Sequence, residues 1–130
     1  MNRLYPLADD FEARIRLYRA EEGGRRQPAV NGIRWDFAYA DDTALTLYMI
    51  WPDFCDALGD SLPRDQPLPV GVELRAWMTV VNDEMRCTLH RQRLAPGTRF
   101  YCHEGPHRVA EGRITRLTGL FDPRSERAGH

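Results

Sequence analysis

Short segments in which apolar and polar side chains alternate recur along this sequence of 130 residues. In the first, Phe11, Ala13, Ile15 and Leu17 alternate with charged residues, the pattern of a strand with one buried face. Further strands, rich in β-forming residues and separated by glycine, proline or aspartate turns, are predicted to begin near Ile33, Ala44, Val72, Thr98 and Arg108. This succession predicts one all-β domain, a six-stranded antiparallel closed β-barrel with a core over residues 11–117.

Three segments do not fit the alternation. In residues 51–59, Pro52 suits a first helical position and Gly59 a helix end, so we predict one short inserted helix there. A proline-rich connector, 63–69, follows it. Residues 79–94 fit a strand or a helical turn equally well, and the polar residues 122–130 are expected to form a loose tail.

The charge balance excludes several function classes. The 18 basic and 19 acidic residues nearly cancel, so no overall field draws the chain to nucleic acids or anionic membranes. Every basic residue is arginine, which removes all chemistry that depends on a lysine.

The cysteines and the apolar stretches indicate where the protein works. The three cysteines, Cys55, Cys87 and Cys102, cannot all pair internally, and no leader-like segment precedes the first strand, so we expect a reduced, cytoplasmic protein. The longest apolar stretch, 44–51, is far shorter than the ~20 residues of a membrane span, and we expect no membrane association.

Two glycine-containing motifs stand out between the predicted strands. The first is the run Glu-Glu-Gly-Gly-Arg at 21–25, followed by Gln-Pro at 27–28 and an aromatic strand at 32–39. The second spans 97–112 and contains His103, Glu104 and Gly105, with a glycine at 112 that predicts a bulge or a close backbone approach. In order and spacing both resemble the signature loops of the third, C-terminal β-barrel domain of translation elongation factor Tu. The resemblance covers roughly 11–117, although its middle, 40–94, is longer than in that family.

The resemblance implies a stand-alone homologue of that barrel without its GTPase domain. A chain without lysine holds neither a phosphate loop nor a guanine-reading Asn-Lys-x-Asp motif, so no GTP binding is expected. In the family the third domain contacts the T arm of aminoacyl-tRNA, the exchange factor Ts and its own first domain. The counterparts of the RNA-facing edge would be Arg99, Glu104, Gly105, His107 and Arg108. The counterparts of the domain-facing loop would be Glu22, Gly23, Gly24 and Arg25.

A non-catalytic binding module without a cofactor is the function that we predict, most simply for a protein partner. Its contact surface would be the apolar residues of the expanded middle and the following strand, namely Trp51, Phe54, Leu58 and Trp77. The alternative is an RNA or tRNA module with an arginine face, for which Pro106 in place of a glycine and His107 in place of an arginine weaken the contact. That face would comprise Arg99, Arg108, Arg113 and Arg116. A solvated strand face explains the same arginines, and self-association through an open barrel edge remains a further alternative.

Two other hypotheses, a zinc site and an enzyme, have less support in the sequence. A zinc site could draw on Cys87, His90, Cys102, His103 and His107, but their spacing fits no compact zinc-finger pattern. Cys102 and His103 are also adjacent on a predicted strand and therefore face opposite sides. An enzyme could use Asp83, Glu84, Cys87 and His90, but these residues are bunched on one ambiguous segment and match no known catalytic geometry. We therefore expect neither a metal site nor an enzyme.

Overall fold

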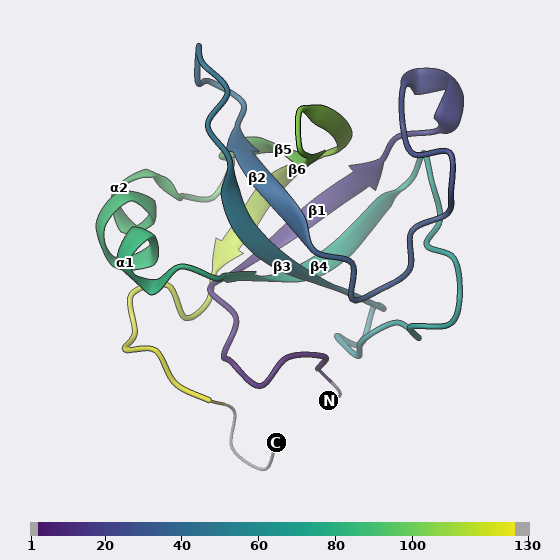
Figure 1. The fold of residues 1–130 in the computed structure, drawn as a ribbon. Coiled ribbons are helices and arrows are strands. Elements are labelled where there is room, and N and C mark those ends of the chain that lie inside the picture. Colours follow the sequence, from purple (N-terminus) through teal and green to yellow (C-terminus); the bar gives the residue numbers. More distant parts are fainter. Residues whose placement is uncertain (1–2, 127–130) are drawn as a thin grey trace.

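Six antiparallel strands close into a barrel in the computed structural model, which describes residues 3–126 (Figure 1). The strands follow the order β1-β4-β3-β2-β5-β6, and β6 pairs with β1 to complete the closure. Their bounds are β1 Phe11–Leu17, β2 Trp35–Tyr39, β3 Tyr48–Cys55, β4 Glu73–Val80, β5 Arg99–Glu104 and β6 His107–Leu117. The predicted fold class is confirmed.

The inward-facing residues of β1 are those that the alternation predicts. Phe11, Ala13, Ile15 and Leu17 are all buried, and they meet aromatic rings from the opposite side of the barrel. The rings of Phe37 and Phe100 stack with centroids 4.7 Å apart, and the ring of Phe11 contacts both edge-on. Burying each such ring contributes about 1.5–3 kcal/mol, so these aromatic residues are a main source of the barrel's stability.

Gly112 allows the aromatic core to approach the backbone of β6, as its position in the sequence predicts. A Cβ atom at this position would lie 2.6 Å from the Phe100 ring and 2.9 Å from the Arg14 carbonyl oxygen. Any larger residue would displace the ring or separate β6 from β1, because both contacts are shorter than van der Waals distance.

The single short helical segment is present, but its predicted position at 51–59 is wrong. Residues 48–55 form β3, and a turn follows in which the Asp56 carboxylate accepts hydrogen bonds from the amides of Leu58 and Asp60. Pro52 is tolerated because β2 pairs with β3 only as far as Ile50. At Pro52 the strand is paired with β4 alone, and its other edge is free of a neighbouring strand. Pairing with β4 therefore overrides the local helix signals.

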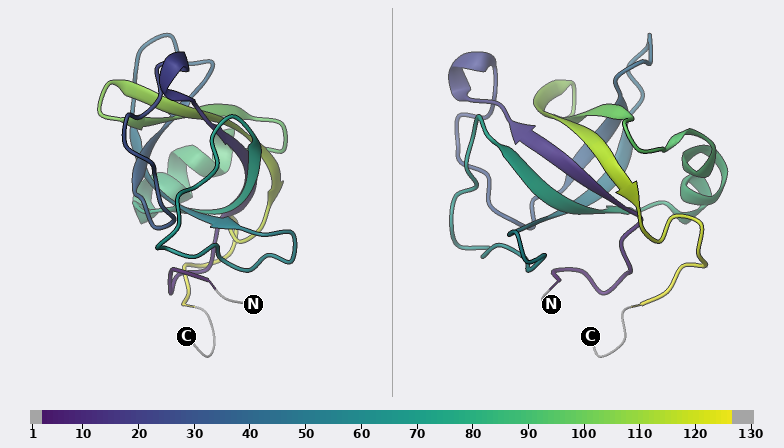
Figure 2. Two further views of the ribbon diagram at one scale, coloured as in Figure 1. Left: turned by 90° about the vertical axis from the view of Figure 1, so that its right-hand side faces the viewer. Right: turned by 180° about the vertical axis from the view of Figure 1, so that it is seen from behind.

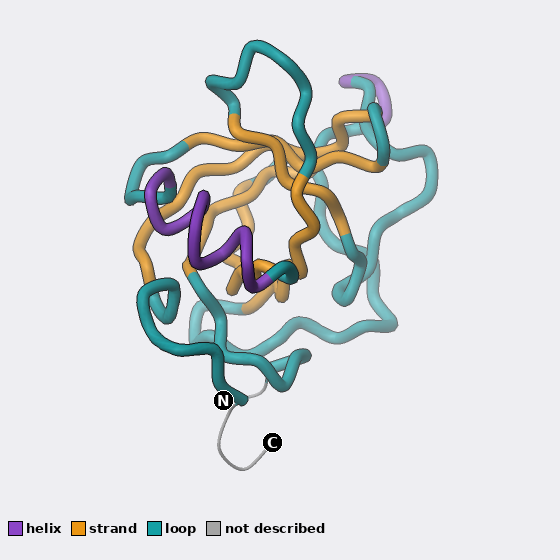
Figure 3. Tube along the Cα trace, turned by 60° about the vertical axis from the view of Figure 1, so that its left-hand side comes forward, coloured by secondary structure: helices purple, strands orange, loops and turns teal. Residues whose placement is uncertain are grey.

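The helix forms instead within the segment that the sequence left ambiguous. It consists of α1 (Asp83–Met85), a π-helical turn (Arg86–His90) and α2 (Arg91–Arg93), and the Asn82 side chain caps its start by accepting from the Met85 amide at 3.0 Å. Figure 3 and the left view of Figure 2 show it lying across one end of the barrel. Among residues 3–126, no helix has the length and apolar character needed to cross a membrane.

A buried ion pair holds this helical segment on the barrel. Arg86 Nε donates to Asp10 Oδ1 at 2.6 Å, and both side chains are almost inaccessible to solvent. The same guanidinium donates to the carbonyl oxygens of Gly119 and Asp122 at 2.7 and 2.6 Å. Burial is favourable here because the charge has an opposite partner and its donors have acceptors.

The first part of the expected tail is attached to the barrel, contrary to the prediction of a loose segment. The Ala8 amide donates to the Ser125 carbonyl at 3.0 Å, and Leu7 forms a β-bridge with Glu126. The Arg124 guanidinium also donates to the carbonyl of Val80. The rest of the predicted tail, 127–130, lies outside the described residues.

Candidate functional site

The two motifs that the sequence singles out meet at one end of the barrel. Arg25 donates to the Glu104 carboxylate at 2.7 Å, and the Trp35 indole donates to the same carboxylate at 2.9 Å. His107 Nε2 donates to the Gly23 carbonyl at 2.5 Å. Glu104 and His107, expected on the RNA-facing edge, therefore contact Arg25 and Gly23 of the loop expected to face another domain.

Strand direction explains why these loops are adjacent. β1 is antiparallel to β6, and β6 is antiparallel to β5, so β1 and β5 run in the same direction. The loops that follow β1 and β5 must then leave the barrel at the same end. The helical segment follows β4, which is antiparallel to β1, and lies at the other end (Figure 2).

Internal hydrogen bonds shape the first loop. Residues 20–22 form a 3-10 turn, and the Glu22 carboxylate accepts from the Arg19 amide at 2.9 Å and from the Arg16 guanidinium at 3.0 Å. These hydrogen bonds, the one from the Arg19 backbone first, lower the pKa of Glu22. Gly23 has a φ of 93°, and a Cβ at Gly24 would lie 2.3 Å from the Tyr18 carbonyl oxygen, so both positions require glycine. The motif thus has a structural explanation at Glu22, Gly23 and Gly24, whereas Arg25 reaches across to the second motif.

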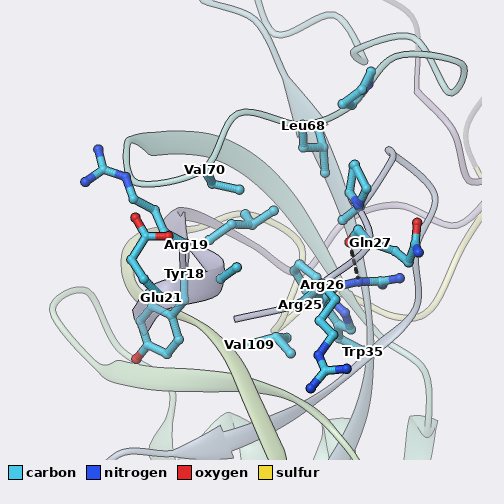
Figure 4. Close-up of a pocket in the computed structure, with 15 residues that line it drawn as sticks. Tyr18, Arg19, Glu21, Arg25, Arg26, Gln27, Trp35, Leu68, Val70 and Val109 are labelled. Carbon is cyan, nitrogen blue, oxygen red and sulfur yellow. Dashed lines mark hydrogen bonds between the residues drawn. The ribbon is translucent and has the colours of Figure 1, made fainter. Parts of the chain in front are cut away.

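A groove runs between this loop and the connector from β3 to β4 (Figure 4). The groove contains two hollows, and the larger one has a volume of about 410 Å³. The floor consists of buried apolar side chains that continue the barrel core, namely Leu17, Ala29, Trp35, Leu68 and Val109. Val70, 45% exposed, forms one wall, and Arg19, Arg25 and Arg26 lie along the rim. An apolar floor with a polar rim is the usual composition of a binding groove.

A second hollow of about 350 Å³ adjoins the first. The two share a wall formed by Arg25, Pro28 and Ala29, and the second continues to Val30, Ile33 and Arg64. The Leu68 amide donates to the Ala29 carbonyl at 2.8 Å, which fixes the connector beside this wall. We call the two hollows together the loop-end groove.

The arginines expected to form one RNA-binding face do not all lie together. Arg99 begins β5 opposite Arg113 of β6, at the other end of the barrel from Glu104 and Gly105. Arg108 stacks on the Tyr101 ring, with its guanidinium carbon 3.5 Å from the ring centroid. Arg113 is paired with Glu73 at 3.2 Å, and Arg116 is paired with Glu12 at 3.1 Å. These contacts leave the expected face without a contiguous set of free guanidinium groups.

The partner surface expected on the expanded middle is also largely absent. Phe54 is fully buried and packs edge-on against Trp35, so its assignment as a contact residue is wrong. Trp77 is 4% exposed and lies beneath the guanidinium groups of Arg3 and Arg75. Trp51 is half-buried between Arg34 and Tyr5, and Leu58, 77% exposed, stands alone on the turn after β3. The correction at Phe54 follows from β3 being a strand, since a strand sends alternate side chains into the core, whereas Trp77 on β4 is covered by arginine side chains.

The residues considered for zinc binding or catalysis are not assembled into one site. No group of three or more histidine, cysteine, aspartate or glutamate side chains with metal-binding geometry occurs within the described part of the chain. Cys102 is fully buried in the core, where desolvation raises the pKa of its thiol. His90 is a buried residue of the helical segment, at the opposite end from the loop-end groove, and its Nδ1 is 2.6 Å from the Tyr39 hydroxyl. Burial lowers the pKa of His90 to about 4, and the nearby positive charge of Arg93 adds to this effect.

Comparison with known proteins does not assign this chain to a family. No protein-family model matches the sequence, and no curated protein matches it. The resemblance to the third domain of elongation factor Tu therefore stays a prediction based on the two motifs.

Proposed function

We propose that the protein is a non-catalytic binding module that holds a segment of a protein partner in the loop-end groove. The observation that carries the proposal is the groove itself, a hollow above the barrel core whose wall includes the 45% exposed apolar side chain of Val70. Removing this apolar wall from water is favourable, so a partner that fills the groove gains from its burial.

The geometry of the groove supports recognition of a partner without large rearrangement. The Arg25–Glu104 ion pair and the hydrogen bond from His107 to Gly23 connect the two motif loops. A preformed groove lowers the ordering cost of association and so raises affinity for a given contact area.

The resemblance to elongation factor Tu supports a binding site at the same end of the barrel. By that resemblance, Glu22 to Arg25 correspond to a loop that meets another protein domain, and this loop borders the groove. A translation-related, cytoplasmic role for this module is part of the proposal. The RNA alternative has less support, because Arg113 and Arg116 are engaged by glutamates and Arg99 lies at the other end of the barrel.

A pull-down from native cytosol with matched variants tests the proposal. Val70→Asp places a charge in the groove, whereas Leu45→Asp makes the same kind of change at a 56% exposed position in the loop after β2, at the other end of the barrel. We expect a ribonuclease-resistant protein partner that is retained by the wild type and by Leu45→Asp and lost by Val70→Asp. Equal recovery with both variants, or recovery that ribonuclease abolishes, would refute the proposal.

A further inference from the structure

We infer that the partner segment bound in the loop-end groove is acidic, with aliphatic side chains that enter the hollows and carboxylates that pair with the rim arginines. This inference rests on the proposed function and adds the chemical character of the partner. It follows from the charges, the packing and the side-chain types of the groove walls.

The walls of the two hollows carry an excess of positive charge. Four arginines line them, and of these Arg25 alone is neutralised by an ion pair, the one with Glu104 at 2.7 Å. Arg19, Arg26 and Arg64 form no ion pair with any residue between 3 and 126. Glu21 is the one carboxylate residue that lines either hollow, so three positive charges face one negative charge. An arriving segment with negative charge would therefore be attracted and oriented.

One of these guanidinium groups lies against glycine backbone. A Cβ atom at Gly71 would lie 2.5 Å from Arg19 Nε, so a larger residue there would displace the Arg19 side chain. Gly71 also has a φ of 74°, a conformation that glycine adopts without strain. The contact limits the positions open to the Arg19 guanidinium before a ligand arrives, which suits the paired hydrogen bonds that arginine makes to a carboxylate.

The apolar surfaces beside these arginines are mostly aliphatic. Val30 and Val70 are 39% and 45% exposed, and prolines and alanine complete the nearby walls. Trp35 lies in the floor but is only 3% exposed, and the hydroxyl of Tyr18 donates to Glu111. Of the two aromatic residues that line the hollows, Trp35 is buried and Tyr18 is half-buried, so neither offers a fully exposed ring for a nucleic-acid base, and this favours an acidic protein segment over a single-stranded nucleic acid. An extended segment that crosses the Pro28–Ala29 wall would place one side chain in each hollow.

Selection from a random peptide library displayed on phage, with the full chain as bait, tests the inference. We expect enriched peptides in which carboxylates flank an aliphatic residue. Their affinity, measured by fluorescence anisotropy, should fall roughly tenfold in Arg26→Gln and in Arg64→Gln, the loss of one charge-assisted contact each, and should fall with added salt. Arg99→Gln, which removes an exposed arginine at the other end of the barrel, is the matched control and should bind as the wild type does.

The possible failures are distinguishable. Enriched peptides that are neutral or basic, but whose binding Val70→Asp abolishes, would overturn the acidic character of the partner and leave the proposed function intact. Peptides unaffected by Val70→Asp would contradict both. A mixed-sequence RNA oligonucleotide that displaces an acidic peptide and binds more tightly at the same salt would also overturn the inference, as would a chain that dimerises through the groove in sedimentation experiments.

Discussion

Protonation of His90 should make the barrel sensitive to acid in a predictable way. The imidazole is 2% exposed, lies against Tyr39 and Tyr48, and has a buried Nε2 without a hydrogen-bond partner among residues 3–126. Burial first, and Arg93 second, lower its pKa from 6.5 to about 4. Between these values the unfolded chain binds a proton that the folded chain excludes. The contribution to stability is therefore complete above pH 6.5 and is lost as the pH falls toward 4.

The size of the effect follows from the two pKa values. Each unit of pKa difference corresponds to about 1.4 kcal/mol. Between neutral pH and pH 5, the contribution of His90 to the free energy of unfolding should therefore fall by about 2 kcal/mol. His90→Gln keeps a polar group that can reach Tyr39 but does not titrate. Urea unfolding at pH 7.5 and pH 5 should show the wild type losing about 2 kcal/mol more than His90→Gln. Equal losses in the two proteins would refute the reasoning, because the other titrating groups are common to both.

Three further predictions concern stability and reactivity. Arg86→Met should lower the free energy of unfolding by about 3–5 kcal/mol in urea titrations, because it removes the closest partner of the buried Asp10 charge and leaves only the longer contact with Arg124 at 3.8 Å; a loss below 1 kcal/mol would contradict the described network. Gly112→Ala should cost about 1–3 kcal/mol, and the additional change Phe100→Leu should restore part of it, whereas strictly additive losses would argue against the proposed contact. In the folded protein Cys87 should be the first thiol to react with Ellman's reagent, because the other two are buried; simultaneous reaction of all three would contradict the barrel core.

Much of the barrel could be predicted from local pattern alone. The four inward residues of β1 follow from alternation, and the close approach at Gly112 follows from a glycine inside a predicted strand. The helix was misplaced because Pro52 and Gly59 are local signals, whereas the conformation of residues 48–55 is decided by pairing with β4. That same error turned the buried Phe54 into a predicted contact residue.

The candidate site required information that one sequence does not contain. The two motifs were recognisable, and the shared direction of β1 and β5 would have placed their loops at one end once the strand order was known. The ion pair between Arg25 and Glu104 joins residues 79 positions apart and depends on strand register. The groove itself depends on the path of the proline-rich connector, which alternation and turn signals do not fix.

Site-specific photo-crosslinking tests the central claim, that a protein partner docks in the loop-end groove, most directly. A photoreactive amino acid at Gln27, an exposed residue lining the groove, would be compared in native cytosol with the same group at Leu45. We expect a discrete protein adduct from position 27 that an acidic groove-binding peptide suppresses, and no such adduct from position 45. An adduct from position 45 alone, or a crosslink to RNA from position 27, would contradict the claim.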